Sequence, residues 1–438
     1  MALLGRKKST DVTEGDELPE EQPPMRAPDV SQRTVAAQRD FLFEAVGALR
    51  PFAMQIHDVV GLTLCEDITA DLDLPLVTTA SVGGYGVRAA DLVGATPATP
   101  VGLYVVGSIA VGDAAAVALV AGAAIEVEAG AILPSGVDAI VPSEYGEVGA
   151  DGHVYLSMEV RLYENLRKAG SDMADGTPLL SAGDVLSPRS VGVLAEVGID
   201  KVLVRPQPRI VVLSVTDVLV APGDPLTRPH QRYEAATALL SAAARAAGAT
   251  VYPVGLLPAD PVLVRQTIAD QQIRADLIVV VGGEDQVDQI VGSSAAVDHA
   301  EVALNGRAPY AFAEFGEDRT PVIFIPSGSV NVYAAFHAFI RPLINQLNEV
   351  DLQATMELID GRLGADVNAA PDVTYYLPAY CSDEGIVDPV SGPDSQMAWD
   401  LERADVLAVI PAGAPAGAGT AVQCIALRHQ DSGTGSRQ

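Results

Sequence analysis

The clearest pattern in the chain lies between residues 208 and 346, where short apolar runs alternate with helical stretches. The runs are rich in Val, Ile and Leu and are too short for helices, so they predict buried strands. Strands that alternate with helices form a parallel sheet covered on both faces. The expected strands are 209–214, 251–254, 276–281 and 321–325, and the expected helices are 233–247, 260–271 and 331–346.

Two further regions have the pattern of β structure. From about residue 58 to 147, and again from about 350 to 429, short apolar runs are broken by Gly and Pro. Breaks at intervals of about eight to twelve residues are typical of all-β units. Helical patterns begin near Ser31 and cover 188–197.

The order of these patterns predicts a multidomain α/β protein. Its 438 residues also exceed the usual size of one domain, which is about 100–200 residues. Both termini are polar and lack periodic apolar positions, which predicts disorder. We expect disordered tails at 1–30 and 431–438, a split domain at 31–75 and 151–205, an inserted β-rich domain at 76–150, an α/β domain at 206–346 and a C-terminal β domain at 347–430.

Composition narrows the possible partners and the location. The net charge is −30, which disfavours nucleic acid and anionic membranes because phosphate contacts need Lys and Arg. No apolar run reaches the roughly 18 residues of a membrane span, and the first residues lack the apolar core of a signal peptide. We therefore expect a cytoplasmic protein with no direct membrane insertion. The three cysteines are far apart, which argues against disulfides or a zinc site.

Seven segments, in order along the chain, resemble motifs of the MoeA/gephyrin family. Residues 75–88 (Pro-Leu-Val-Thr-Thr-Ala-Ser-Val-Gly-Gly-Tyr-Gly-Val-Arg) are similar to the family loop Pro-Phe-Asp-Asn-Ser-Ala-Met-Asp-Gly-Tyr-Ala-Val-Arg. Residues 133–141 (Leu-Pro-Ser-Gly-Val-Asp-Ala-Ile-Val) resemble Leu-Pro-x-Gly-Ala-Asp-Ala-Val-Val. The other five segments are 165–170, 208–217, 281–283, 325–329 and 341–342. In type, the chain looks closest to the gephyrin-like proteins of actinobacteria.

The resemblance implies a fold and an activity. The fold is an elongated MoeA-like subunit with a doubly wound parallel α/β (MogA-like) domain, a β-rich inserted domain and a C-terminal β-barrel, assembled as a homodimer. Active members of the family are molybdopterin molybdenumtransferases, which use Mg²⁺ to insert molybdate into adenylylated molybdopterin and release AMP. Their site lies between the α/β domain of one subunit and the inserted domain of the other. Mg²⁺ and molybdopterin are therefore expected if this activity is retained, and no cofactor is expected otherwise.

Several side chains that this chemistry needs are replaced. Gly83 stands where the family loop has a catalytic Asp, Ala129 where a later loop has Thr, and Val218 where a strand-end motif has an acid. Glu284 and Asp285 stand where the family has Val and Ser, beside the phosphate-bearing ligand. Like charges repel by about 1 kcal/mol at about 4 Å even in water, so this last change opposes the substrate.

Three polar residues remain as vestigial catalytic candidates by resemblance: Asp217, Asp260 and Arg307. Asp217 follows a parallel strand, where ligand-binding residues collect, and is the candidate metal ligand; capping of its own loop is the alternative. Asp260 precedes Pro261 at a helix start, so an N-cap role is favoured over a ligand contact. Arg307 replaces one of two family lysines and could still grip a phosphate, because a guanidinium forks onto two oxygens.

Three further residues are candidates for cofactor binding. Gly282 and Gly283 match a family ligand loop, although a tight strand-to-helix turn explains two glycines equally simply. Ser329 could donate a hydrogen bond to a ligand. Trp399 is expected to serve the core or an interface.

The replacements favour a non-catalytic scaffold that keeps the fold. Resemblance to gephyrin-like proteins implies two partners, the C-terminal peptide of the tubulin-like division protein FtsZ and a membrane receptor, with recruitment to the division septum. The peptide groove is expected between residues 321–346 and 350–429. The aromatic residues to examine near it are Phe336, Phe339, Tyr375 and Tyr376, for which burial in the core is the favoured interpretation.

Two other hypotheses stay open at this point. In one, the chain is a divergent molybdopterin molybdenumtransferase with a reduced site built from Asp217, Asp260 and Arg307. In the other, the vestigial site senses molybdopterin without turnover. Formation of AMP separates the first from the second.

Overall fold

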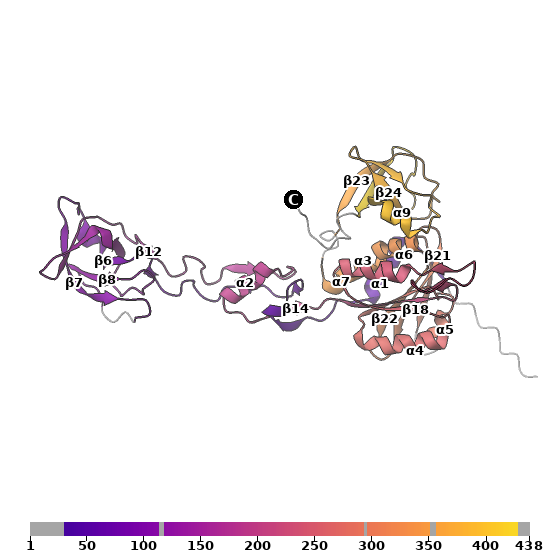
Figure 1. The fold of residues 1–438 in the computed structure, drawn as a ribbon, viewed down its shortest axis with the longest axis horizontal. Helices are drawn as coiled ribbons and strands as arrows, with labels where there is room; N and C mark the ends of the chain where they lie inside the picture. The colour runs from indigo at the N-terminus through magenta and orange to yellow at the C-terminus, as the bar shows by residue number, and fades with distance from the viewer. Residues whose placement is uncertain (1–29, 114–117, 293–295, 351–355, 428–438) are drawn as a thin grey trace, which may run out of the picture.

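The structure is a computed structural model that describes residues 30–113, 118–292, 296–350 and 356–427. The subunit is elongated, with a six-stranded β domain at one end, a thin stalk in the middle, and an α/β domain with a β-barrel beside it at the other end (Figure 1). The expected tails lie outside the described residues, except for Val30.

A seven-stranded sheet forms the middle layer of the α/β domain. In spatial order its strands are β1 (Ser31–Arg33), β20 (Val297–Val302), β21 (Ala308–Phe315), β22 (Thr320–Ile325), β19 (Leu277–Val281), β15 (Arg209–Val215) and β18 (Thr250–Leu257). The four strands expected from the sequence pair in parallel, as β18-β15-β19-β22. The hairpin β20-β21 was not expected, and β21 runs antiparallel to both of its neighbours.

Helices cover both faces of this sheet (Figure 1). One face carries α1 (Val35–Ala45), α3 (Ala236–Ala246) and a continuous helix made of α6 (Ser329–Ala335), the π-helical turn η5 (Phe336–Ile340) and α7 (Arg341–Asn348). The other face carries α4 (Pro261–Gln271) and α5 (Val287–Val291). Separate apolar clusters fill the two interfaces, as a doubly wound fold requires.

The segment 31–46 belongs to the α/β domain. Strand β1 pairs in parallel with β20, and Val35 and Leu42 of α1 lie in the same apolar cluster as the sheet. Thr34 caps α1 by accepting a hydrogen bond from the Ala37 N–H at 3.2 Å. The sequence pattern alone assigns this segment to the split domain at 31–75. Its apolar face packs instead on the large sheet, where more apolar surface is available than on the stalk.

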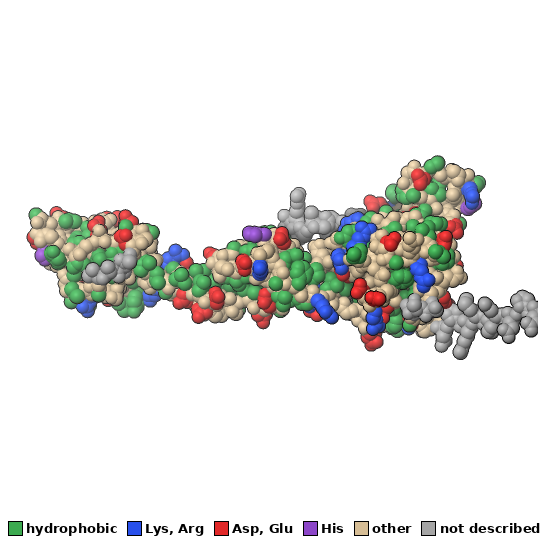
Figure 2. All heavy atoms as spheres, turned by 90° about the horizontal axis from the view of Figure 1, so that it is seen from below, with side chains coloured by type: hydrophobic (Ala, Val, Ile, Leu, Met, Phe, Trp, Pro, Cys, Tyr) green, Lys and Arg blue, Asp and Glu red, His purple; other side chains and the backbone are tan. Residues whose placement is uncertain are grey.

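The stalk is built from small units. Strands β2 (Phe52–Gln55), β14 (Lys201–Arg205) and β3 (Thr63–Leu64) form a sheet on which α2 (Pro188–Glu196) packs. Two short ribbons continue it, β4 (Ile68–Thr69) with β13 (Pro178–Leu180), and β5 (Thr79–Ala80) with β12 (Leu166–Arg167). Acidic side chains gather along the stalk on the face shown in Figure 2.

The inserted domain at the far end is one six-stranded sheet with its own apolar clusters. Its strands in spatial order are β10 (Gly146–Val148), β11 (His153–Leu156), β7 (Val101–Ile109), β8 (Ala123–Val127), β6 (Gly84–Val87) and β9 (Ala139–Pro142).

The C-terminal β domain is a closed barrel, as expected. Its strands in order are β23 (Leu358–Leu363), β25 (Ile386–Pro389), β24 (Tyr375–Cys381), β26 (Val406–Ile410) and β27 (Ala421–Ala426). A short helix, α9 (Ala398–Arg403), lies between the barrel and α6. The barrel also contacts the β20–β21 loop of the α/β domain, where Leu304 forms a β-bridge with Thr374.

Candidate functional site

The carboxyl ends of the parallel strands meet at one edge of the sheet, which we call the ligand edge. Because β20 runs parallel to β1 and opposite to β21, the β20–β21 loop ends at this edge too. The topology therefore places all the site residues expected in the α/β domain along one edge of the sheet, with Arg307 beside β20 and Asp260 after β18 separated by four strands. The site residues are Asp217, Asp260, Gly282, Gly283, Arg307 and Ser329.

The two aspartates at this edge stabilise local backbone. The Asp217 carboxylate accepts a hydrogen bond from the Ala259 N–H at 2.9 Å, which ties the loop after β15 to the loop after β18. Asp260 is the N-cap of α4 and accepts hydrogen bonds from the N–H groups of Val262 and Leu263 at 2.9 and 3.4 Å. The N-cap interpretation of Asp260 is thus confirmed.

The glycine pair is explained by a close backbone contact. Gly282 has φ +80°, and a Cβ there would lie 2.6 Å from the carbonyl oxygen of Val215. Gly283 has φ +73° and faces the Val215 side chain. Both positions therefore require glycine to let β19 turn past the end of β15, with no ligand involved. Ser329 is nearly buried in the first turn of α6.

Glu284 places an acid at the ligand edge in a half-buried position. Its Oε2 atom is shielded from solvent and has no hydrogen-bond partner among the residues that the structure describes. Burial raises the pKa of this carboxyl, and the neighbouring charge of Asp285 raises it further. The carboxylate form is therefore disfavoured here, and a bound phosphate would add to the repulsion.

Arg307 is engaged by two acids. Its guanidinium forms an ion pair with Asp372, which precedes β24 of the barrel, and a longer one, at 3.5 Å, with Glu301. The Arg307 guanidinium lowers the pKa of the Asp372 carboxyl, mainly through this hydrogen bond. The cation expected to hold a phosphate thus helps to join the α/β domain to the barrel.

The replaced residues of the inserted domain lie at the opposite end of the subunit. Gly83 precedes β6, and Ala129 follows β8. Figure 1 shows these strands separated from the α/β domain by the whole stalk. Within one subunit, these two loops cannot complete the ligand edge.

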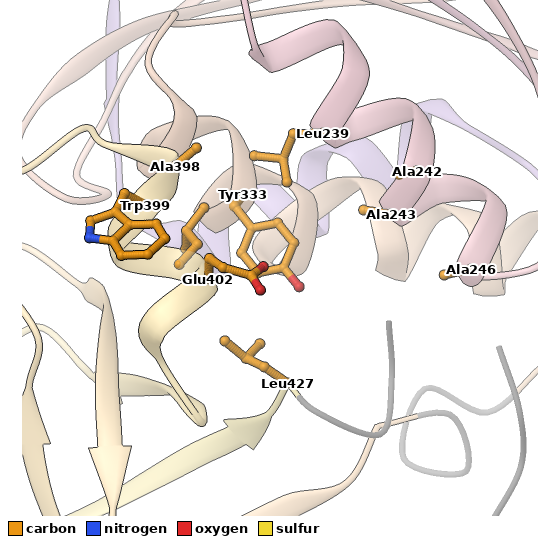
Figure 3. A pocket seen from close by; sticks show the side chains of 10 residues that line it. Leu239, Ala242, Ala243, Ala246, Tyr333, Ala398, Trp399, Glu402 and Leu427 are labelled. Atoms are coloured by element: carbon orange, nitrogen blue, oxygen red, sulfur yellow. The ribbon is translucent and has the colours of Figure 1, made fainter. Parts of the chain in front are cut away.

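A second candidate site is an apolar groove between the α/β domain and the barrel. It has a volume of about 520 Å³ and lies between α3, α6, α9 and the end of β27 (Figure 3). Small side chains of α3 form its floor, and Tyr333, Trp399 and Glu402 line the opposite side. The lining residues are Leu239, Ala242, Ala243, Ala246, Tyr333, Ala398, Trp399, Leu401, Glu402 and Leu427.

Trp399 places an exposed aromatic ring beside this groove. The indole is 63% exposed, so Trp399 is not a core residue. Exposed tryptophans that flank a hollow are common anchors for bound peptides, because a rigid ring offers a large apolar area. Glu402, one turn later on α9, adds a negative charge to the same wall.

The four aromatic residues expected at a peptide groove are core residues. Phe336 and Phe339 are at most 3% exposed and face the sheet, while Tyr375 and Tyr376 are buried on β24. Burial in the core therefore describes all four side chains. The apolar groove described above lies between residues 321–346 and 350–429, because Tyr333 comes from the first range and α9 from the second. The sequence signal for the groove was the alanine face of α3, which leaves space that a larger side chain would fill.

Two absences hold for the described residues. Among them, no group of three or more His, Cys, Asp or Glu side chains is arranged to hold a metal ion. None of the helices in the described ranges combines the length and apolar character needed to cross a membrane.

Three parts of the chain match known family regions. Residues 33–198 match the MoeA N-terminal region (domain I and II), residues 211–346 a probable molybdopterin binding domain, and residues 360–427 the MoeA C-terminal region (domain IV). The matched segments cover the stalk, the inserted domain, the α/β domain and the barrel.

Individual relatives cover most of the chain. Molybdopterin molybdenumtransferase 2 of Mycobacterium tuberculosis is 29% identical over 407 residues, which is 84% of this chain and 100% of that protein. Molybdopterin molybdenumtransferase 1 of the same organism is 26% identical over 414 residues, 87% of this chain and 96% of that protein. A crystal structure of the MoeA protein of Pyrococcus horikoshii aligns with a TM-score of 0.75 at 23% identity, over 90% of this chain and 99% of that one. At this identity the structural likeness shows the fold.

Proposed function

The chain belongs to the MoeA family, and from that premise we propose that it is a scaffold that keeps the family architecture, holds a peptide partner and does not insert molybdenum. The observation that carries this proposal is the set of acidic groups at the ligand edge. The carboxyl groups of Glu284 and Asp285 stand where the resemblance places a phosphate-bearing ligand, and the candidate cation Arg307 is paired with Asp372.

Each vestigial candidate has a structural task that accounts for its presence. Asp217 and Asp260 cap backbone N–H groups, and the two glycines allow the turn after β19. Transition-state stabilisation of a transferred oxyanion needs donors and cations that are aimed at open space. The hydrogen-bonded and paired state of these residues supports the loss of that chemistry.

The groove supports the positive part of the proposal. Its floor of alanines on α3 admits one or two apolar side chains, and Trp399 can cover them from the side. Glu402 favours a basic group at the rim of the bound segment. The class of ligand that fits is therefore a short peptide with an apolar anchor beside a Lys or Arg.

The partner that this class suggests, by resemblance to gephyrin-like proteins, is the C-terminal peptide of FtsZ. The scaffold then acts as a homodimer that presents two grooves and also engages a membrane receptor, which recruits it from the cytoplasm to the division septum. Two grooves would raise the apparent affinity for a polymeric partner without any new contact.

A second candidate function has its own support. The two mycobacterial relatives are named molybdopterin molybdenumtransferases, and the chain spans nearly all of their length. In that case this chain inserts molybdate into adenylylated molybdopterin through a reduced site.

One pair of measurements separates the two functions. We expect no growth when the chain is expressed in a strain that lacks its molybdenum-insertion enzyme and depends on a molybdoenzyme. We also expect no AMP release from adenylylated molybdopterin with molybdate and Mg²⁺, but micromolar binding of a synthetic FtsZ C-terminal peptide in calorimetry. Growth together with AMP release would overturn the scaffold. Absence of peptide binding by a folded dimer would remove the proposed partner.

A further inference from the structure

The helix α9 forms one wall of the groove, yet little of it is buried. It has six residues, and among them only Asp400 and Leu401 are buried. A helix of this length is not stable by itself, because its few hydrogen bonds do not offset the free-energy cost of nucleation. Its position must therefore come from the contacts that hold its two ends.

One set of contacts joins α9 to the barrel. Arg403, its last residue, donates a hydrogen bond to the Tyr380 hydroxyl at 3.2 Å. On the preceding segment, the Val390 N–H donates to the Pro378 carbonyl at 2.9 Å. The Ser395 hydroxyl is hydrogen-bonded to the Asp400 carboxylate, which closes the turn into the helix.

A second set joins the same segment to the α/β domain through one side chain. The Oε1 atom of Gln396 accepts a hydrogen bond from the backbone N–H of Asn331 at 3.1 Å. Its Nε2 atom donates to the Oδ1 atom of Asn331, also at 3.1 Å. Gln396 thus caps the first turn of α6 from a position 65 residues away, and α6 has no side-chain cap of its own at Gly328.

Gly328 leaves the space that this contact needs. Its φ is +106°, and a Cβ there would lie 2.6 Å from the Gln396 Oε1 atom. The backbone of the α6 N-terminus and the Gln396 amide are therefore fitted to each other. The contact joins Asn331 and Gln396. Tyr333, on one side of the groove, follows Asn331 by two residues, and Trp399, on the other side, follows Gln396 by three.

We propose that Gln396 is a positioning residue for the groove. Its amide fastens the start of α9 to α6 and so sets the distance between Trp399 and Tyr333. The effect on a bound peptide rests on the proposed function, whereas the effect on α9 itself does not.

The test uses the full-length protein and four single variants. Gln396→Ala removes both hydrogen bonds. Gly328→Ala adds a Cβ that displaces the Gln396 amide from Asn331. Gln396→Glu is the conservative variant: it still accepts from the Asn331 N–H, and the Asn331 amide can turn to donate its second hydrogen bond. Gln423→Ala, at an exposed position on the barrel strand β27, is the matched control.

Amide hydrogen exchange by mass spectrometry is the first readout. We expect exchange in residues 398–404 to rise about thirtyfold in Gln396→Ala and Gly328→Ala, since the two lost hydrogen bonds are each worth about 1 kcal/mol. Exchange should stay near wild type in Gln396→Glu and Gln423→Ala. Unchanged exchange in Gln396→Ala overturns the proposal, and so does a rise spread evenly over the whole barrel, which would mean a general structural role.

Affinity for the FtsZ C-terminal peptide is the second readout. Emission of Trp399, the single tryptophan of the chain, can report the titration. We expect binding to weaken about tenfold in the two disruptive variants and to return in Gln396→Glu. If the wild-type protein does not bind this peptide, the proposed partner fails, and the exchange measurement still decides the role of Gln396.

Discussion

The Asn305 side chain pairs with the backbone of Tyr376 as a neighbouring strand would. Its Oδ1 atom accepts from the Tyr376 N–H at 2.7 Å, and its Nδ2 atom donates to the Tyr376 carbonyl at 3.2 Å. Asn305 also has φ +49°, a left-handed conformation that Asn tolerates better than most residues. One side chain of the ligand edge thus fixes the barrel against the α/β domain.

Replacing Asn305 should loosen that joint. We expect Asn305→Ala to lower the free energy of unfolding by about 1–3 kcal/mol, because two part-buried hydrogen bonds are lost and the backbone conformation is strained. Asn305→Gly separates the two causes, since it loses the hydrogen bonds without the strain. Urea unfolding checks both. Equal stability of Asn305→Ala and wild type would contradict the role of this pair.

Gly282→Ala should be strongly destabilising for a reason unrelated to ligands. The added Cβ would meet the Val215 carbonyl oxygen at 2.6 Å, on top of the strain of φ +80°. We expect a loss of about 3 kcal/mol or more. The control is Gly223→Ala, which has φ +101° and no atom within 4 Å of the added Cβ, so it carries strain without the collision. Thermal unfolding of the two variants should differ clearly, and similar values would remove the close-contact explanation.

The pH dependence of stability should reveal Glu284. Its folded-state pKa is raised by burial, so the folded protein binds this proton more tightly than the unfolded chain does. The stability that this group contributes is complete below its ordinary pKa and is lost as the pH rises through the raised value. We expect Glu284→Gln to become progressively more stable than wild type as the pH rises above about 4.5, and the difference should vanish below that pH. Chemical unfolding at several pH values measures this, and a difference that grows toward acid would have the wrong sign.

Removing the acids from the ligand edge should make it more tolerant of phosphate. In the double variant Glu284→Val, Asp285→Ser, two negative charges are replaced by the residue types of the family loop. We expect affinity for AMP to rise about fivefold or more, because each like charge at about 4 Å costs about 1 kcal/mol. Calorimetry with AMP checks this, with Asp270→Asn on the exposed face of α4 as the control. The variant should still fail to release AMP from adenylylated molybdopterin, since Gly83 and Ala129 are unchanged.

Filling the groove should block a peptide without harming the fold. Ala242 is exposed on α3 and lines the groove, so Ala242→Arg extends a long side chain into it while keeping a good helix former. We expect peptide binding to fall by at least about tenfold with an unchanged unfolding temperature. Ala269→Arg, at an exposed alanine on α4, is the matched control. Peptide binding that survives Ala242→Arg would place the binding site elsewhere.

The parallel core of the fold was predictable because its strands are continuous apolar runs. Strand β19 (Leu-Ile-Val-Val-Val) is buried at every position, so its pattern is unambiguous. The hairpin β20-β21 was missed because β20 mixes Asp298, His299 and Glu301 with its apolar residues, so it is not a continuous apolar run. The sequence also did not predict that α1 packs on the α/β domain. An apolar stripe shows that a helix is covered, but it does not show which surface covers it.

The ligand edge could be predicted from the sequence better than the groove. Topology places residues that follow parallel strands at one edge, so the ligand edge follows from the sequence once the strands are known. The pairing of Arg307 with Asp372 cannot be predicted from the sequence, because the two residues come from different domains. An apolar groove lies between the two regions named for a peptide groove, and the four aromatic residues named with them face the core. Its floor is made of alanines on α3, and a face of small side chains does not by itself show which element, here α9, lies across from it.

The thin stalk lets the two ends of the subunit accept amino-acid substitutions independently. The apolar clusters of the inserted domain and of the α/β domain share no side chain among the described residues, so the two ends of the subunit have separate cores. Substitutions in the loops at one end therefore carry no folding penalty to the other. A subunit divided in this way can give up a reaction assembled from both ends while every part of it remains stable, and the surfaces left behind are free to acquire a different partner.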